Sequence, residues 1–195
     1  MKWIWIRHGE TDVNRSGCYL GHLDVPLNTR GFEQIARLRE QDWEITKVYS
    51  SDLLRCKQTA EMLVESSPIS WTPALRELNF GTWEGKRYEE IMQVESEWMK
   101  AWYEDPFSLA PPQGETLQQL GNRVDAWLDG SLVELEEEDV ILVVSHGGPI
   151  RWLLSRWMLG DVKQFWDVPA VPHGGGLMVE WNGQQWGQPQ FLEAK

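Results

Sequence analysis

The amino-acid sequence predicts an α/β fold, a three-layer sandwich in which helices cover both faces of a mostly parallel sheet. Two short apolar runs, residues 3–6 and 140–144, have the composition of strands that are buried on both faces. Strand candidates alternate along the chain with segments whose apolar residues recur at helical spacing. No shift in composition and no internal repeat divides the sequence, so we expect residues 1–195 to form one domain.

The first predicted strand covers residues 3–6 and ends at Arg7. Residues 14–31 are rich in glycine, asparagine and proline and hold no period, which predicts a long loop, ordered or disordered. A helix is expected to begin at Gly31, with apolar side chains on one face. These side chains are Phe32, Ile35 and Ala36.

Residues 47–50 predict a second strand, and a helix follows it directly. The apolar residues of this helix lie at i, i+4, i+7 and i+8 and share one face. They are Cys56, Ala60, Leu63 and Val64. This spacing puts Arg55 in the first turn of the helix, next to the end of a strand.

Two amphipathic helices are expected in the middle of the chain, over residues 87–103 and from residue 115 onward. Three prolines make residues 105–114 a loop between them. The apolar stripes are Ile91, Val94, Trp98 and Trp102 in the first helix and Leu117, Leu120, Val124, Leu128, Leu132 and Leu135 in the second. Gly121 and Gly130 should cost the second helix about 1 kcal/mol each relative to alanine.

Residues 140–144 form the last buried strand, which leads into a short helix and a hairpin. The helix is marked by Ile150, Leu153, Leu154 and Trp157. The hairpin joins residues 176–181 and 186–192 around Asn182-Gly183, a dipeptide typical of tight turns.

The composition excludes several classes of protein. Eighteen basic and thirty acidic residues give a formal charge of −12, whereas a nucleic-acid binder needs a basic surface. No apolar run approaches the ~18–20 residues of a membrane span, and the first residues lack a secretory signal. Two cysteines, Cys18 and Cys56, favour a reduced compartment. We therefore expect a cytoplasmic protein with no nucleic-acid or membrane partner.

Both apolar runs end in a histidine that is followed by glycine. The first leads into Arg7-His8-Gly9 and the second into Ser145-His146-Gly147-Gly148. Because the carboxyl ends of neighbouring parallel strands meet at one edge of a sheet, His8 and His146 should project into one crevice. The glycines allow the backbone amides that begin the next helix to approach an anion closely.

Two arginines at the same edge indicate which anion this is. Arg7 adjoins His8, and Arg55 begins a helix directly after a strand. Two guanidinium groups and two imidazoles repel one another unless a multiply charged anion lies between them. A phosphate monoester dianion fits, because arginine binds its oxygens in pairs, and one charge pair at 4 Å is worth about 4 kcal/mol at an effective dielectric constant of 20. Each residue alone would be structural, but the four together predict a small phosphate ester as the ligand.

Five blocks of this sequence resemble the histidine phosphatase superfamily, also called the phosphoglycerate mutase-like superfamily. They occur in the family's order, with Asn14 beside the first, and the similarity covers residues 3–150 and weakens toward residue 181. The blocks are RHGET at 7–11, GHLDVPLNTRG at 21–31, SSDLLRCKQTA at 50–60, ELNFGTWEG at 77–85 and VVSHGG at 143–148. The resemblance implies a phosphoglycerate mutase-like fold.

The resemblance also implies the catalytic roles. His8 is the nucleophile that forms a phosphohistidine, while Arg7, Arg55 and His146 bind the phosphoryl oxygens. Glu77 protonates the leaving oxygen and then takes a proton from the attacking water. No metal or other cofactor is expected, because the acidic residues show no ligand spacing and the arginines supply positive charge.

Further residues are expected to bind substrate. Asn14 would add a neutral hydrogen bond to the phosphoryl group, and Thr11 and Gly21 would line the pocket through their backbone groups. Gly147 would offer its amide, and His173 would lie at the rim of the pocket as a residue of specificity.

Glu77 should lie at the less polar edge of the pocket, away from the arginines. The structural alternative for Glu77 is a salt bridge with Arg76. Glu84 is interpreted as structural because glycines flank its loop, and His22 either touches substrate or occupies a surface turn.

The resemblance favours a phosphatase of small molecules over its alternatives. Mutases of the superfamily carry an insertion near the acid residue, whereas Arg87 here follows Glu77 by only ten positions. A weak phospho-ligand binder is the other alternative, although the nucleophile, second histidine and acid are all present. Trp102 together with residues 105–106 and 111–116 resembles the lid of α-ribazole phosphatases and of broad-specificity bacterial phosphatases alike. Either a monomer or a homodimer is compatible with the sequence.

Tryptophan is unusually frequent, with thirteen residues in the chain. Most lie on apolar faces, among them Trp98, Trp102, Trp127 and Trp157, where packing in the core explains them. Trp83 and Trp102 are the two that we expect near a substrate, since a flat ring there could stack on an aromatic group.

Overall fold

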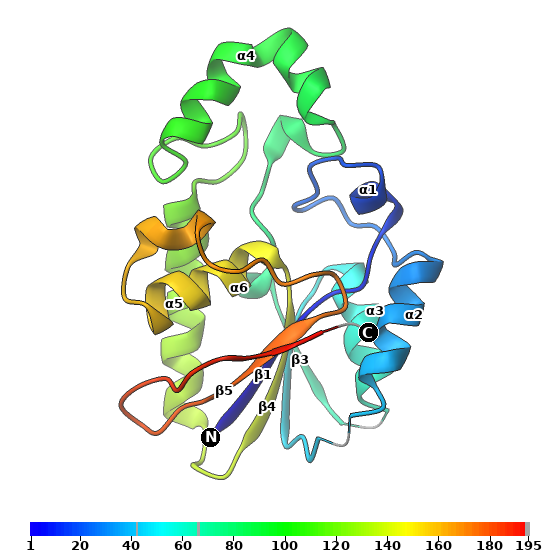
Figure 1. Ribbon diagram of the computed structural model, residues 1–195, viewed down its shortest axis with the longest axis vertical. Helices are drawn as coiled ribbons and strands as arrows, with labels where there is room; N and C mark the ends of the chain where they lie inside the picture. Colours follow the sequence, from blue (N-terminus) through cyan, green and yellow to red (C-terminus); the bar gives the residue numbers. More distant parts are fainter. Residues whose placement is uncertain (42, 66, 194–195) are drawn as a thin grey trace.

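The two apolar runs of the sequence are the two central strands of one sheet. The computed structural model describes residues 1–41, 43–65 and 67–193, and its sheet has the order β3-β2-β4-β1-β5-β6 (Figure 1). The strands are β1 (Lys2–Arg7), β2 (Lys47–Ser51), β3 (Ile69–Thr72), β4 (Val140–Ser145), β5 (Gly176–Glu180) and β6 (Gln190–Leu192). The first four run parallel and β5 and β6 form an antiparallel hairpin, which confirms the predicted fold class.

The register between β1 and β4 determines where their histidines emerge. Arg7 lies opposite Ser145, so His8 and His146 follow the two strands at the same level. Side chains of β1 alternate between two cores, as the period of a strand requires. Trp3 and Trp5 belong to one core, and Ile4 and Ile6 belong to the other.

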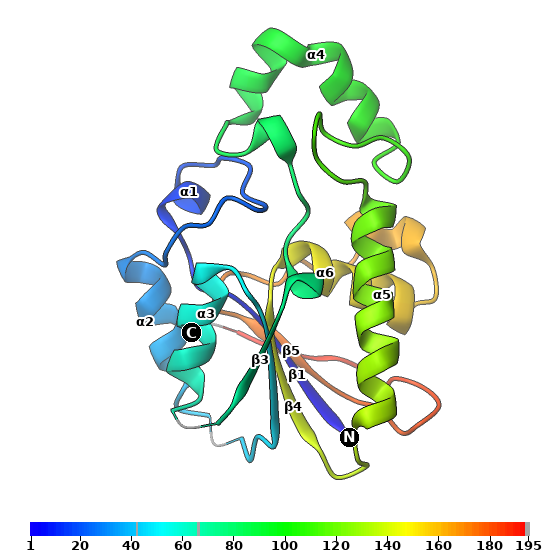
Figure 2. The ribbon, with the colours of Figure 1, turned by 180° about the vertical axis from the view of Figure 1, so that it is seen from behind.

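Helices cover both faces of the sheet (Figures 1 and 2). On one side, α2 (Thr29–Leu38) and α3 (Leu54–Leu63) pack on the core that contains Ile4 and Ile6. On the other side lie α5 (Leu117–Glu134) and α6 (Gly147–Trp152), which continues into the π-helical turn η3 (Leu153–Met158). The described residues also form short 3-10 turns: η1 (Pro73–Leu75), η2 (Gly81–Trp83) and η4 (Val162–Trp166).

Some boundaries differ from those that the sequence predicts. The expected loop contains the one-turn helix α1 (Asp12–Arg15), and α2 begins at Thr29, because the Asn28 side chain accepts a hydrogen bond from the Gly31 amide and caps the helix. Strand β3 was not predicted, since it is a short edge strand whose residues are half-exposed or exposed.

A cap stands over the carboxyl edge of the sheet, formed by α4 (Tyr88–Glu104) and the two chain segments that join it to the base (Figure 1). The predicted stripe of α4 was wrong at Val94 and Trp98, which are 73% and 45% exposed. Glu95 has non-helical angles (φ −134°, ψ 38°), and this kink changes the face that α4 buries. The buried side runs through Ile91, Met99 and Trp102 instead.

Gly121 has a packing role that the sequence did not reveal. A Cβ atom at this position would lie 2.0 Å from the Trp152 ring, so glycine lets α5 and α6 approach closely. Across the described ranges, no helix is long and apolar enough to cross a membrane. Cys18 and Cys56 are both free thiols.

Candidate active site

His8 and His146 meet at the carboxyl edge of the sheet, with ring centroids 5.0 Å apart. Both are buried. Nδ1 of His8 lies 2.7 Å from the Gly9 carbonyl, which can only accept, so Nδ1 carries the hydrogen. Nε2 of His8 therefore holds a lone pair, and Nε of Arg55 donates to it over 3.3 Å.

The surroundings of both imidazoles keep them uncharged. Burial lowers the pKa of His8 well below its ordinary value, and the positive charges of Arg55 and Arg7 lower it further. Burial and Arg55 likewise lower the pKa of His146. The His8 lone pair is thus available at neutral pH without removal of a proton.

Arg55 is buried in the first turn of α3, where the sequence predicted it. Its terminal nitrogens donate to the Gly21 carbonyl at 2.6 Å and to the Leu23 carbonyl at 2.9 Å. These bonds aim the guanidinium at His8. Gly21 was predicted to line the pocket, but its carbonyl holds Arg55 and its amide donates to Glu84 at 2.8 Å.

Arg7 ends β1 beside the first residues of α6. One terminal nitrogen donates to the Val171 carbonyl at 2.8 Å, while the buried Nε has no hydrogen-bond partner among the described residues. A Cβ atom on Gly147 would lie 3.5 Å from Cζ of Arg7, which places the guanidinium against the start of α6. An N–H donor that is buried and unpaired beside a helix N-terminus suits an anion.

Contacts in the interior fix the His146 ring. Its Nε2 lies 2.9 Å from Oγ of Ser51 and 3.3 Å from Sγ of Cys56. Burial raises the pKa of Cys56 to about 12, so the thiol stays protonated beside the imidazole.

Glu77 reaches the same edge from the segment that follows η1. Its carboxylate accepts hydrogen bonds from the Gly148 amide at 3.0 and 3.1 Å and from the Leu78 amide at 2.9 Å. Glu77 lines one pocket together with Arg7 and Arg151, so it does not lie apart from the arginines as the sequence led us to expect. The free N–H groups at the start of α6 attract the carboxylate.

The alternative structural role of Glu77 is excluded, because Arg76 pairs with Asp52 through two hydrogen bonds of 2.6 Å. Glu84 is structural as predicted. Its carboxylate accepts from four backbone amides, those of Gly21, His22, Leu23 and Phe80.

Thr11 and Asn14 form the capping box of α1 near His8. The Asn14 carbonyl oxygen accepts from the amide and the hydroxyl of Thr11, at 3.2 and 2.9 Å. The predicted backbone contact of Thr11 with a ligand is therefore replaced by this internal bond. Any contact of Asn14 with a phosphoryl group has to come from its amide nitrogen.

Two further histidines lie close to these groups. The ring of His173 is 5.3 Å from that of His8, and its buried Nε2 has no partner in the part of the chain that the structure describes. Burial, Arg7 and Arg55 lower the pKa of His173 to about 3. His22 lies in a bend with its side chain 29% exposed, and its Nε2 lies 3.1 Å from the Glu77 carbonyl.

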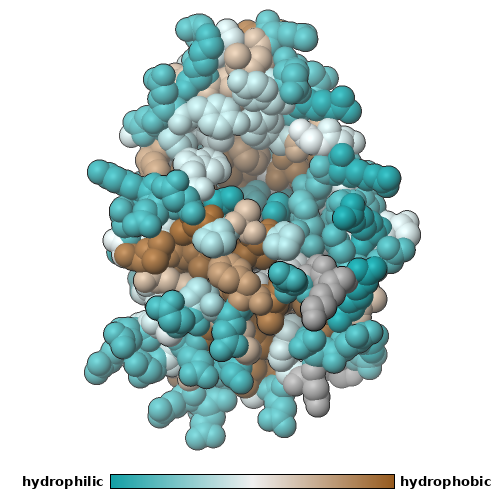
Figure 3. Space-filling model, viewed as in Figure 1, coloured by the Kyte–Doolittle hydropathy of each residue, from teal (hydrophilic) through white to brown (hydrophobic). Residues whose placement is uncertain are grey.

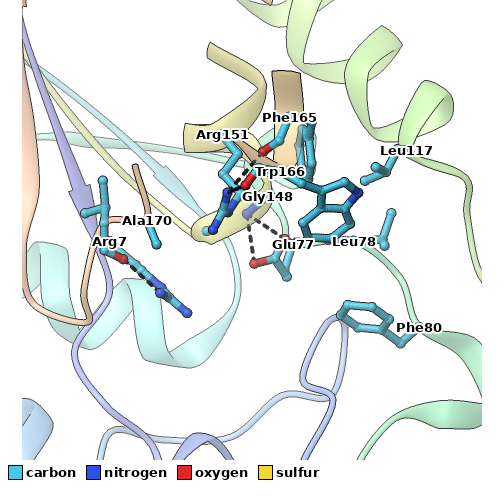
Figure 4. A pocket seen from close by; sticks show the side chains of 12 residues that line it. Arg7, Glu77, Leu78, Phe80, Leu117, Gly148, Arg151, Phe165, Trp166 and Ala170 are labelled. Carbon is cyan, nitrogen blue, oxygen red and sulfur yellow. Dashed lines mark hydrogen bonds between the residues drawn. The ribbon is translucent and has the colours of Figure 1, made fainter. Parts of the chain in front are cut away.

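A pocket of about 230 Å³ opens between Arg7, Glu77 and an aromatic wall (Figure 4). The wall contains Phe80, Phe165 and Trp166. In Figure 3, hydrophobic side chains gather across the middle of the face that is shown, below the mostly hydrophilic cap.

The two tryptophans that the sequence predicts near a substrate do not line this pocket. Trp83 and Trp102 are buried in the core of the cap. The aromatic side chains of η4 are found instead, and no period or motif marked that segment. Arg151 was also missed, although it follows Gly147 by four residues and so shares its face of the helix. Arg151 holds η4 in place by donating to the Phe165 carbonyl at 3.0 Å (Figure 4).

Cationic and anionic groups thus lie together at one edge of the sheet. In residues 1–41, 43–65 and 67–193, no three His, Cys, Asp or Glu side chains are arranged to hold a metal ion. Uncharged His8 lies among Arg7, Arg55 and His146, and Glu77 lies on the side of the pocket. Such an arrangement can bind a dianion, attack it with Nε2 and exchange a proton with a carboxyl group.

Comparison with known proteins agrees with this geometry. A model of the histidine phosphatase superfamily (branch 1) matches residues 3–190. A protein of Escherichia coli strain K12 named adenosylcobalamin/alpha-ribazole phosphatase is 34% identical over 168 residues, which are 84% of this chain and 82% of that protein. A protein of Yersinia pestis named probable phosphoglycerate mutase GpmB is 35% identical, over 77% of this chain and 71% of its own length. The crystal structure of the alpha-ribazole phosphatase from Shigella flexneri superimposes with a TM-score of 0.92 at 30% identity, covering 100% of this chain and 97% of that one.

Proposed function

Because the chain belongs to the histidine phosphatase superfamily (branch 1) and is a phosphatase, we propose that His8 takes the phosphoryl group from its substrate. The observation that carries this assignment is the state of Nε2. The hydrogen on Nδ1 is committed to Gly9, the imidazole is uncharged, and the lone pair faces Arg55. A nucleophile and the cations that bind its target are thus adjacent.

In the first half-reaction, Nε2 of His8 attacks phosphorus as the bond to the leaving oxygen breaks. Arg7, Arg55 and His146 bind the three equatorial oxygens, on which charge gathers in the transition state. Glu77, in its protonated form, gives its proton to the leaving oxygen. The products are an alcohol, the Glu77 carboxylate and phosphohistidine.

In the second half-reaction, the Glu77 carboxylate takes a proton from a water molecule as its oxygen attacks phosphorus. The bond between phosphorus and Nε2 breaks, which releases inorganic phosphate and restores His8 and protonated Glu77. One carboxyl group serves both steps because leaving alcohol and attacking water use the same side of the phosphoryl group. Nε of Arg7 and Nε2 of His173, both buried and unpaired among the described residues, support a phosphoryl site at this place.

The aromatic wall supports a substrate that carries a flat, largely apolar group next to its phosphate. Arg151 lies with its guanidinium carbon 5.8 Å from the Trp166 ring centroid, which stiffens the wall. We propose a small phosphorylated metabolite of this kind, with α-ribazole 5′-phosphate as the first candidate since relatives are named for it. Thr11, Asn14 and Gly21 then act by shaping the site, and Gly147 by its amide.

Mutase activity is the second candidate, because one relative is named a probable phosphoglycerate mutase. We propose that water rather than a second substrate hydroxyl accepts the phosphoryl group. Conversion of 3- to 2-phosphoglycerate that depends on 2,3-bisphosphoglycerate should therefore be absent. We further propose that residues 1–195 act as one domain in the cytoplasm, as a monomer or a homodimer.

Turnover of p-nitrophenyl phosphate in the presence of EDTA tests the proposal. The protein should release phosphate, and a brief reaction stopped with base should trap an acid-labile phosphoenzyme. His8→Ala should abolish both signals. Turnover that survives His8→Ala would overturn the assignment of the nucleophile.

A panel of phosphate esters, compared by kcat/KM, identifies the substrate class. It should include α-ribazole 5′-phosphate, sugar phosphates and phosphoglycerates. A preference for esters with a flat apolar group would support the role of the aromatic wall, and a preference for sugar phosphates would contradict it.

A further inference from the structure

Arg123 of α5 donates hydrogen bonds to the backbone of the segment that carries Glu77. One terminal nitrogen donates to the Ala74 carbonyl at 2.8 Å and to the Arg76 carbonyl at 2.7 Å. The other donates to the carbonyl of Glu77 itself at 2.8 Å. Residues 76–80 belong to no helix or strand, so their backbone has no regular hydrogen bonds to hold it. Arg123 therefore supplies three of the hydrogen bonds that hold this segment, beside the contact of His22 with the Glu77 carbonyl.

Glu115 in turn holds Arg123. Its carboxylate accepts from Nη2 of Arg123 at 2.6 Å and from Nε at 3.2 Å, and it accepts from the Asn79 amide at 3.0 Å. Together with the three carbonyls, these bonds use all five N–H donors of the guanidinium. The Arg123 side chain is 21% exposed and that of Glu115 16%, so the pair is shielded from most solvent.

The two ends of Glu77 are thus fixed by different elements. The amide that begins α6 binds the carboxylate, and Arg123 binds the main chain. We propose that Arg123, held by Glu115, is a positioning residue for Glu77. Arg123 keeps the Glu77 carboxyl group within reach of the leaving oxygen. This inference rests on the acid role of Glu77 in the proposed function.

Only arginine suits this task, because a planar fork can reach several carbonyls in fixed directions while an ammonium group cannot. Proton transfer depends steeply on the position of the acid, and general acid catalysis typically contributes about 10²- to 10⁴-fold. Arg123→Lys should therefore weaken proton donation while leaving the attack by His8 in place.

The experiment measures kcat/KM for 4-nitrophenyl, phenyl and alkyl phosphates. In that order the leaving oxygen becomes more basic and depends more on a proton from the acid. Arg123→Lys should lower kcat/KM for the alkyl ester at least about tenfold more than for the 4-nitrophenyl ester. Glu115→Gln should cause the same selective loss to a smaller degree. Thermal unfolding will show whether each variant folds, and Glu115→Gln provides the test if Arg123→Lys does not fold. In the background of Glu77→Gln, adding Arg123→Lys should produce little further selective loss.

Asp125→Asn is the matched control. Asp125 lies on the same helix, its side chain is 24% exposed, and it accepts hydrogen bonds from the indoles of Trp152 and Trp157, away from Glu77. It should lower thermal stability without a selective loss on the alkyl ester. An equal loss of activity on all three esters for Arg123→Lys and Glu115→Gln would overturn the inference.

Failure of the inference and failure of the proposed function give different results. If Glu77→Gln is selective for poor leaving groups and the two other variants are not, Arg123 is merely structural. If Glu77→Gln itself loses activity equally on all esters, the acid role of Glu77 is wrong.

Discussion

Lowering the pH from 7 to 5 should destabilise the protein, and His173 should account for a defined part of that loss. In the folded state, burial together with Arg7 and Arg55 lowers the pKa of His173 to about 3. In the unfolded chain the same imidazole titrates near its ordinary value of about 6.5. Between these two pKa values, His173 is protonated in the unfolded chain and unprotonated in the folded protein.

The sign and size follow from proton linkage. A histidine with a lowered pKa in the folded state contributes no penalty above pH 6.5, and stability is lost as the pH falls from there toward 3. Between pH 7 and pH 5, a single such histidine removes about 2 kcal/mol of the free energy of unfolding. The lowered pKa values of His8 and His146 act in the same direction.

Urea unfolding of the wild type and of His173→Asn at both pH values isolates this contribution. Loss of packing affects the variant equally at pH 7 and pH 5, so it cancels from the comparison. The difference in unfolding free energy between the two proteins should shift by about 2 kcal/mol in favour of the variant at pH 5. Val171→Ala, which alters a buried neighbour without a titratable group, should show no such shift. A difference that stays constant from pH 7 to 5 for His173→Asn would refute the reasoning.

Three other outcomes are expected. Gly148→Ala places a Cβ 2.1 Å from Oε1 of Glu77, so it should displace the acid and lower kcat/KM for alkyl esters at least about tenfold; unchanged rates would show that Glu77 tolerates movement. Trp166→Ala should raise KM for a phosphate with a flat aromatic group about tenfold, the equivalent of ~1.4 kcal/mol, and leave a small alkyl phosphate unaffected. Iodoacetamide at pH 8 should label half-exposed Cys18 but not Cys56, which is buried and has a raised pKa; mass spectrometry of the native protein decides this, and early labelling of Cys56 would contradict its burial.

Patterns that repeat along the chain made the central strands and the helices that pack on the sheet predictable. The apolar runs at 3–6 and 140–144 have no alternative to burial on both faces, and their shared ending in His-Gly placed His8 beside His146. The helix after residues 47–50 placed Arg55 correctly for the same reason. Each of these inferences needed only a period and the direction of a strand.

Features that depend on tertiary contacts could not be predicted in this way. The kink at Glu95 reverses the exposure of Val94 and Trp98, and no helix breaker marks it. The aromatic wall comes from a segment without a period, and no motif or spacing in the sequence marks Arg123. Its function is visible once the chain brings the Glu77 segment against α5.

The pairing of β1 with β4 and β5 has a consequence for how the chain folds during synthesis. β1 consists of residues 2–7, yet its partners begin at residues 140 and 176. The four consecutive side chains from Trp3 to Ile6, which are buried in the folded protein, therefore have no partner strand until most of the chain has left the ribosome. Late pairing of distant strands slows folding and exposes an aggregation-prone segment. The same pairing brings His8 to His146, so a nascent or truncated chain cannot assemble the site, and enzymatic activity reports completion of the fold.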